Sequence, residues 1–145
     1  IIEHNFVDAV RNSVGAIVFK ENSIVLVKNF RFTIDDFSWE LPGGWINNGE
    51  TALNAIQRKV ENEIGYAVEG IQRLGEGNPW LGLSNKEHYY FLIQAGKKLE
   101  HRDNEFVREV RFFNFKKIEE MVKRGEISDQ STLTGLFLAK LHKNL

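Results

Sequence analysis

The sequence predicts an α+β fold built as a single domain over residues 1–145. This prediction rests on recurrent β-branched runs with strand-like alternation, on helical periodicity over residues 50–64, and on a second helical pattern near the end of the chain. The turn-like segments between the strand runs favour mainly antiparallel pairing. The chain is long enough to bury one sizeable core, and it shows no repeat, low-complexity tract or linker that would mark a second domain.

The composition limits the classes of function. Lysine and arginine (19) nearly balance aspartate and glutamate (20), so no global field attracts nucleic acid or an anionic membrane, and neither is expected as a partner. The absence of cysteine excludes disulfides, thiolate metal sites and cysteine nucleophiles. No apolar run approaches the roughly 18 residues of a membrane span, and the first residues lack the pattern of a secretory signal. We therefore expect a cytoplasmic protein.

Strand signals recur along the chain. Residues 14–32 contain two β-branched runs joined at residues 20–23, which predicts a hairpin. The segment SWELPGG, residues 38–44, predicts a short strand that ends at Pro42 and the glycine pair. Further strands are expected at residues 67–75, 88–96 and 105–115, with a loop rich in Gly, Pro and Asn over residues 76–87.

The first helix is expected from Glu50 to Ile64. Asn48 or Gly49 can serve as its N-cap, Glu50 would place a negative charge in the first turn, and Gly65 suits the left-handed residue that ends a helix. A turn of about 100° per residue groups the apolar side chains into one stripe that should be buried. This stripe contains Leu53, Ile56, Val60 and Ile64.

Two further helices are expected near the end of the chain. Residues 116–126 predict a short helix that stops near Gly125, and residues 128–144 predict a terminal helix capped by Ser128 or Asp129. Apolar residues at helical spacing should dock one side of the terminal helix on the body of the protein. These residues are Leu133, Leu136, Phe137 and Leu141.

The segment LPGGWINNGETALNAIQRKVENEIGY, residues 41–66, resembles the Nudix box, G-x5-E-x7-R-E-U-x-E-E-x-G-U, in which U is a bulky apolar residue. WELPGG immediately before the box strengthens the match. The resemblance implies the Nudix fold, a mixed or antiparallel sheet sandwiched between helices. The positions in register are Gly44, Glu50, Arg58, Val60, Glu63 and Gly65, with Tyr66 acceptable at the end.

Residues 24–32 and 105–141 are also similar to the ADP-ribose pyrophosphatase type within this family. The resemblance implies a hydrolase that cleaves the phosphoanhydride of a nucleoside diphosphate linked to another moiety, such as ADP-ribose or a nucleotide sugar. It implies Mg²⁺ or Mn²⁺ as the cofactor and a small-molecule nucleoside diphosphate derivative as the partner. Many such enzymes are dimers, which makes a homodimer one expectation.

The resemblance further implies which residues act. Glu63 and Glu50, with a backbone carbonyl of Gly43 or Gly44, would hold the metal. A glutamate from a later loop would assist, with Glu105 the best-placed match and Glu87 or Glu109 as competitors. The candidate catalytic residues are therefore Glu63, Glu50, Arg58 and Glu105.

Two positions depart from the box, because Lys59 and Asn62 stand where the family has glutamates. Unit charges ~4 Å apart interact by about 4 kcal/mol at an effective dielectric of ~20, so a lysine beside a divalent cation should weaken its binding. We therefore expect weak metal binding. Lys59 can instead contact phosphate directly as a point charge.

Substrate binding is assigned to four residues, each with a structural alternative. Lys59 and Asn62 could be solvated surface residues, Arg31 matches an arginine near the substrate in ADP-ribose-cleaving relatives, and Trp80 could stack on a nucleobase or belong to the core. Glu50 and Arg58 could be structural, forming an ion pair with each other. The four histidines share no ligand-like spacing and are assigned no metal.

Two functions remain open, besides a weaker third in which the fold is retained only as a protein- or RNA-binding surface, with the near-neutral charge arguing against RNA. The first is a Nudix pyrophosphohydrolase of the ADP-ribose pyrophosphatase type with a weakened metal site. The second is a catalytically inactive Nudix domain that binds a nucleotide as a sensor or interaction module, which Lys59 and Asn62 together motivate.

Overall fold

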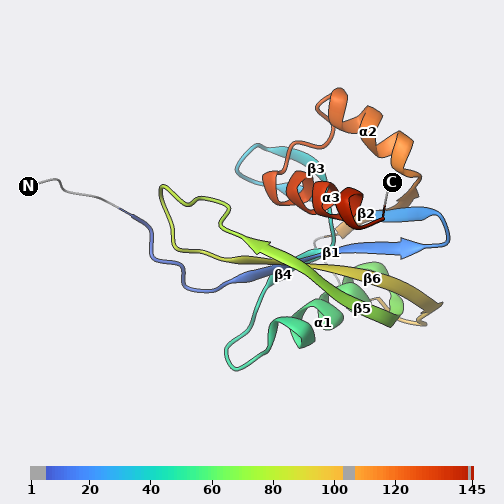
Figure 1. The fold of residues 1–145 in the computed structure, drawn as a ribbon, viewed down its shortest axis with the longest axis horizontal. Helices are drawn as coiled ribbons and strands as arrows, with labels where there is room; N and C mark the ends of the chain where they lie inside the picture. The colour runs from blue at the N-terminus through green and yellow to red at the C-terminus, as the bar shows by residue number, and fades with distance from the viewer. Residues whose placement is uncertain (1–5, 103–106, 144) are drawn as a thin grey trace, which may run out of the picture.

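The computed structural model describes residues 6–102, 107–143 and 145. One mixed sheet lies between α1 on one side and α2 and α3 on the other, as the α+β Nudix architecture requires (Figure 1). The helices are α1 (Ala52–Ile64), α2 (Phe115–Lys123) and α3 (Gln130–Lys143). The strands are β1 (Ser13–Lys20), β2 (Ser23–Arg31), β3 (Asp36–Glu40), β4 (Gly43–Trp45), β5 (Tyr66–Gly77), β6 (His88–Lys98) and β7 (Val107–Phe113).

The sheet forks between β1 and β2. These strands pair only beside their hairpin turn, at Phe19↔Ile24 and Lys20↔Ser23. Beyond that point β2 pairs with β3 and β7, whereas β1 pairs with β4 and, in parallel, with β6. The chain crosses from one arm of the fork to the other at Leu41 and Pro42, between β3 and β4. The glycine pair that was expected to end a strand therefore starts a new one on the opposite arm.

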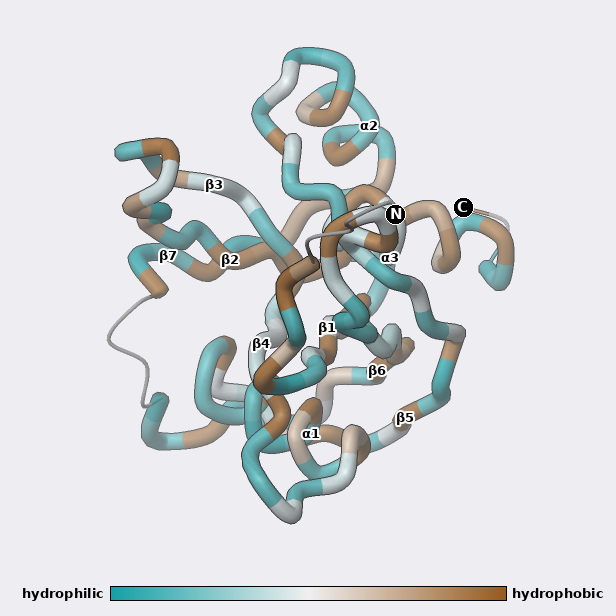
Figure 2. The backbone as a smooth tube through the Cα atoms, turned by 90° about the vertical axis from the view of Figure 1, so that its left-hand side faces the viewer, coloured by the Kyte–Doolittle hydropathy of each residue, from teal (hydrophilic) through white to brown (hydrophobic). Residues whose placement is uncertain are grey.

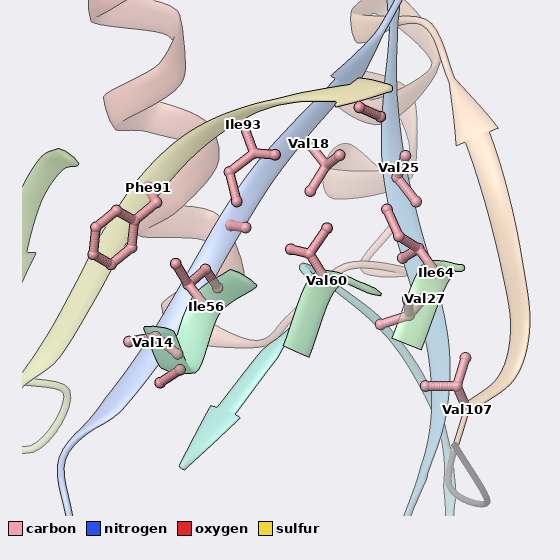
Figure 3. Packing of buried hydrophobic residues seen from close by; sticks show 13 residues of the cluster. Val14, Val18, Val25, Val27, Ile56, Val60, Ile64, Phe91, Ile93 and Val107 are labelled. Atoms are coloured by element: carbon pink, nitrogen blue, oxygen red, sulfur yellow. The ribbon is translucent and has the colours of Figure 1, made fainter. Parts of the chain in front are cut away.

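Both faces of β1 are buried, which explains its nearly continuous apolar sequence. Val14, Ala16 and Val18 face α1, where they form one core cluster with residues of β2, β6 and β7 (Figure 3). Ile17, on the opposite face, belongs to a second cluster with α2 and α3. The sheet separates these two clusters, and the fork opens at the end of β1 and β2 away from their hairpin turn.

Helix α1 begins later than the sequence suggested. Thr51 is its N-cap and accepts a hydrogen bond from Asn54 N at 3.2 Å, in place of the expected Asn48 or Gly49. Gly65 ends the helix in the left-handed conformation with φ of 71°, as predicted. Ile56, Val60 and Ile64 are buried, but Leu53 is 49% exposed. The expectation for Leu53 was wrong: in the first turn of α1, Ala52 packs against the core in its place.

Helix α3 is capped by Asp129, whose carboxylate accepts from Thr132 N at 2.7 Å. Leu136 is buried, but Phe137 and Leu141 are 61% and 62% exposed, so half of the expected apolar stripe faces away from the sheet.

Figure 2 shows α1 and α2 on opposite sides of the sheet, and along each helix hydrophilic residues alternate with hydrophobic ones. No helix among the described residues is long and apolar enough to cross a membrane.

Candidate ligand site

Glu63 lies in the last turn of α1, directly beneath β4. Its Oε2 accepts a hydrogen bond from Gly43 N at 2.9 Å, which joins the helix to the glycine pair. The side chain is buried, and this burial raises the pKa of Glu63 to about 7, against the opposing effects of the Gly43 N–H and the charges of Lys59 and Arg31. The site therefore contains a carboxyl group that changes protonation near neutral pH.

Lys59 lies one helical turn before Glu63 and points to the same place. Its Nζ is 3.9 Å from Glu63 Oε1, and its side chain is 25% exposed. A Cβ added to Gly44 would lie 2.8 Å from both Nζ and Cε of Lys59. Gly44 also has φ of 151°, a conformation that side chains disfavour. Glycine at this position thus lets the lysine ammonium lie directly against the backbone of β4.

Glu50 is bound to Arg58 rather than directed at Glu63. Arg58 Nε and Nη2 each donate to one carboxylate oxygen of Glu50 at 2.7 Å. Asn47 N donates to Glu50 Oε2 at 2.9 Å, and Arg58 Nη2 also reaches the carbonyl of Trp45 at 3.4 Å. The Arg58 hydrogen bonds, then that of Asn47, lower the pKa of Glu50 to about 2. This ion pair attaches the loop between β4 and α1 to the helix.

Arg31 and Glu40 form a second ion pair on the β2–β3 arm. Arg31 Nε donates to Glu40 Oε1 at 2.7 Å, and Asn29 Nδ2 donates to Glu40 Oε2 at 3.2 Å. Glu40 is buried, and its hydrogen bond raises the pKa of Arg31 above the usual value. Sequence reasoning missed Glu40, although its position three residues before Gly43 in WELPGG was a usable signal.

A cavity of about 330 Å³ opens at the fork of the sheet. It is bounded by Arg31 and Glu40 on one arm, by the glycine pair and Trp45 on the other, and by the first turn of α3. Leu41 N donates to Thr132 Oγ1 at 3.1 Å, so α3 is fixed to the strand crossing at the edge of the cavity. The cavity thus adjoins the same glycine pair that Glu63 and Lys59 contact from the α1 side.

Lys86 and two tryptophans form the outer edge of this cavity. Lys86 Nζ lies 4.1 Å from the ring centroid of Trp45 and 5.5 Å from that of Trp80, both distances typical of cation–π contacts. Burial lowers the pKa of Lys86 below its usual value. The loop that carries it is fixed to the N-terminal segment through Glu87 N, which donates to Asn12 Oδ1 at 3.0 Å. The edge therefore combines a cation with two exposed aromatic surfaces.

His88 also lines the cavity, and sequence reasoning gave it no role. Its Nδ1 lies 2.7 Å from Ser13 Oγ, a contact that the parallel pairing of β1 with β6 creates. Burial, and then the nearby Lys86 charge, lower the pKa of His88 to about 4. His88 is therefore a neutral polar group in the wall at physiological pH.

The sequence-predicted residues divide into separate groups. Arg31, Trp80, Gly43 and Gly44 line the cavity, and Lys59 and Glu63 lie beneath the glycine pair. Asn62 is exposed on α1. Glu105 lies outside the described residues. Of its competitors, Glu87 is hydrogen-bonded to Tyr89, and Glu109 is paired with Arg111.

The donor set does not fit a preformed magnesium centre. Over residues 6–102, 107–143 and 145, no group of three or more His, Asp or Glu side chains converges on one point. Glu63 has an ammonium 3.9 Å away, the buried Glu40 is paired with Arg31, and Glu50 is bound to Arg58 through both oxygens. Magnesium requires several oxygen ligands at 2.0–2.1 Å, which this arrangement does not present.

Comparison with known proteins identifies similar chains. The model of the NUDIX domain family matches residues 9–134. A CMP-5'-(N-acetyl-N-hydroxy-3-aminopropyl)phosphonate hydrolase of Streptomyces rubellomurinus is 26% identical over 137 residues, which cover 93% of this chain and 66% of that protein. An RNA pyrophosphohydrolase of Psychromonas ingrahamii is 35% identical over 75 residues, which cover 51% of this chain and 39% of that protein. The chain thus spans less than two thirds of the length of these relatives.

Two solved structures share the fold. The crystal structure of an ADP compounds hydrolase has a TM-score of 0.82 at 12% identity, covering 95% of this chain and 77% of that chain. A NUDIX hydrolase from Nitrosomonas europaea has a TM-score of 0.75 at 16% identity, covering 92% of this chain and 90% of that chain. At these identities the likeness concerns the fold, and it matches the expected sheet sandwiched between helices.

Proposed function

Because the chain belongs to the NUDIX family, we propose that it is a slow hydrolase of a nucleoside diphosphate linked to a second moiety. The observation that carries this proposal is the cavity at the fork, which combines cationic side chains with exposed indole rings beside the glycine pair. A diphosphate provides the anion for the cations, and a nucleobase provides the planar surface for stacking.

Among the described side chains, two cations line the cavity, and a third lies behind its wall. Arg31 lies on the β2–β3 arm, Lys86 at the outer edge, and Lys59 beneath the glycine pair. Trp45 and Trp80 offer the stacking surface. The printed names of the curated relatives, a CMP-linked phosphonate hydrolase and an RNA pyrophosphohydrolase, support a nucleotide-derived substrate. We propose on this basis that the diphosphate lies against β4.

Glu63 is the group on which turnover is proposed to depend. Its raised pKa allows it to accept a proton near neutral pH, and Gly43 N–H fixes its orientation. The described residues provide no preformed divalent-metal centre, so we propose that side-chain cations balance part of the charge on the phosphates and that metal binds weakly. We expect slow turnover for this reason.

A product assay tests the proposal. ADP-ribose, UDP-glucose and CMP-linked esters are incubated with the protein, with and without Mg²⁺ or Mn²⁺, and the products are identified by mass spectrometry. Glu63→Gln should reduce any turnover by at least about tenfold, which corresponds to loss of a general base or orienting group. Glu61→Gln, a carboxylate on the same helix that pairs with Gln57, is the matched control. Robust turnover that survives Glu63→Gln would refute this assignment.

A second candidate function is favoured by one observation, the ion pair between Lys59 and Glu63. The Lys59 ammonium neutralises the charge of the Glu63 carboxylate, which would otherwise attract a metal ion. Such a site suits a domain that binds a nucleotide derivative without cleaving it. Binding of an intact ligand, recovered unchanged after prolonged incubation, would identify this function in place of hydrolysis.

A further inference from the structure

We infer that the Lys59 ammonium is the resident cation of this site, so that diphosphate binding needs no metal and Lys59 itself keeps divalent cations away from Glu63. The inference rests on the proposed diphosphate-binding function for its ligand, whereas its metal-exclusion part can be tested without any nucleotide. It concerns a property of this chain's own residues and follows from the poor fit of the donor set to magnesium.

The position of Lys59 is fixed from several directions. Its side chain packs against Gly44, whose missing Cβ leaves room for Cε and Nζ. Glu63 Oε1 lies 3.9 Å away, while the other oxygen of the same carboxylate is held by Gly43 N at 2.9 Å. The ammonium therefore lies beside the backbone of β4, between the helix and the cavity wall.

The ammonium also retains donor capacity. Its ion pair with Glu63 is longer than a hydrogen bond, and Lys59 donates no hydrogen bond within 3.5 Å to any other described residue. A lysine ammonium has three donors, and a phosphate oxygen is a strong acceptor for them. The side chain is 25% exposed and lies against Gly44, a residue of the cavity wall, so we infer that a phosphate placed at the glycine pair is the acceptor for these donors.

The same geometry opposes a divalent cation. A magnesium ion bonded to Glu63 Oε1 at about 2.1 Å would lie within about 6 Å of Nζ, because Nζ is 3.9 Å from that oxygen. Three positive charges would then share one buried carboxylate. Asn62, by contrast, is exposed, so a carboxylate placed there would leave this repulsion in place. The lysine is therefore an obstacle to metal in addition to the shortage of oxygen ligands among the described residues.

Metal binding to the protein without nucleotide tests the exclusion. Mn²⁺ is titrated and followed by electron paramagnetic resonance for the unmodified protein, Lys59→Gln and Asn62→Glu. Lys59→Gln should increase Mn²⁺ affinity by about tenfold or more, and Asn62→Glu should change it by less than about threefold. Equal affinity in the unmodified protein and Lys59→Gln, or a larger gain in Asn62→Glu, would overturn the inference.

Ligand binding tests the second part. Pyrophosphate and methylene-bridged ADP are titrated calorimetrically in EDTA and in Mg²⁺. The unmodified protein should bind in EDTA with affinity within about threefold of that in Mg²⁺, Lys59→Gln should lose about tenfold in EDTA, and Lys59→Arg should retain most of the affinity. Lys97→Gln, an exposed lysine near the far end of β6, is the matched control, and circular dichroism verifies that each variant is folded.

The outcomes separate the two proposals. Binding that requires Mg²⁺ would overturn the resident-cation inference and leave the proposed function standing. An absence of binding to every probe, with and without metal, would refute the proposed function and with it the ligand-binding part of the inference. Retained binding in EDTA with unchanged affinity in Lys59→Gln would overturn the role of Lys59 alone.

Discussion

Arg58 donates two hydrogen bonds of 2.7 Å to the two carboxylate oxygens of Glu50, eight residues earlier in the chain. The pair connects α1 to the loop that follows β4. Two oxygens accepting from one guanidinium form the geometry in which charge-assisted hydrogen bonds are strongest. Ionised Glu50 therefore fixes the conformation of this loop.

Acid should weaken the fold partly through Glu50. Its pKa is lowered to about 2 in the folded protein from 4.5, so the stability that its ionised form contributes is present above about pH 4.5. That contribution is lost as the pH falls from about 4.5 to about 2. Chemical unfolding across this range should show a smaller loss in Glu50→Gln than in the unmodified protein. The same slope in both proteins would contradict the prediction, and Glu61→Gln serves as the control.

The ionisation of Glu63 should lower the stability of the fold, whereas that of Glu50 raises it. Its folded pKa of about 7 exceeds the ordinary 4.5, so its contribution to stability is fully present below about pH 4.5 and is lost as the pH rises to about 7. Glu63→Gln keeps an oxygen that can accept from Gly43 N and removes the buried charge. We expect the variant to gain on the order of 1–3 kcal/mol over the unmodified protein at pH 8.

The measurement for Glu63 is urea unfolding at pH 4.5 and pH 8. The two proteins should differ little at the lower pH, where the unmodified carboxyl group is protonated. A variant that is less stable than the unmodified protein at pH 8 would show that the ionised carboxylate stabilises the fold through Lys59 more than burial penalises it.

Ile56 and Leu53 provide a matched test of which face of α1 is buried. Ile56→Ala should lower the free energy of unfolding by about 2–4 kcal/mol, because Ile56 is fully buried in the cluster between α1 and the sheet. Leu53→Ala should change it by less than about 0.5 kcal/mol, because Leu53 is exposed. Comparable losses from both substitutions would show that the Leu53 side chain is buried as Ile56 is.

Trp80 should affect ligand binding more than folding. Its side chain is 56% exposed and lines the cavity, so Trp80→Ala should weaken binding of a nucleotide derivative by about 1–3 kcal/mol, the usual effect of removing a stacking partner. The melting temperature without ligand should change little. Phe32→Ala, another highly exposed aromatic that does not line the cavity, is the control for calorimetric titration.

Local features of the site could be predicted from the sequence. The spacing of Arg58, Glu63 and Gly65 identified the box helix and its left-handed end, because these residues lie within about two helical turns of one another. The start of α1 was displaced because Thr51 competes successfully with its neighbours as the N-cap. Such a competition depends on how the preceding loop is held by Glu50 and Arg58.

Long-range features could not be predicted in the same way. The contact of Ser13 with His88 requires the parallel pairing of β1 with β6, and no local periodicity in either segment indicates that register. Glu40 likewise becomes recognisable as part of the site once β2 and β3 are paired and its carboxylate accepts from the side chains of Asn29 and Arg31. The cavity itself arises from the fork, which is a property of the whole sheet.

The fork of the sheet also determines how a ligand of this cavity can be found. A molecule bound there contacts both arms and the first turn of α3, segments that come together only in the folded chain. Such a ligand binds the native state and not the unfolded one, so at 100 times its Kd it adds about 2.7 kcal/mol to stability. Melting temperature measured against a metabolite collection can therefore identify the natural ligand without any assumption about its chemistry.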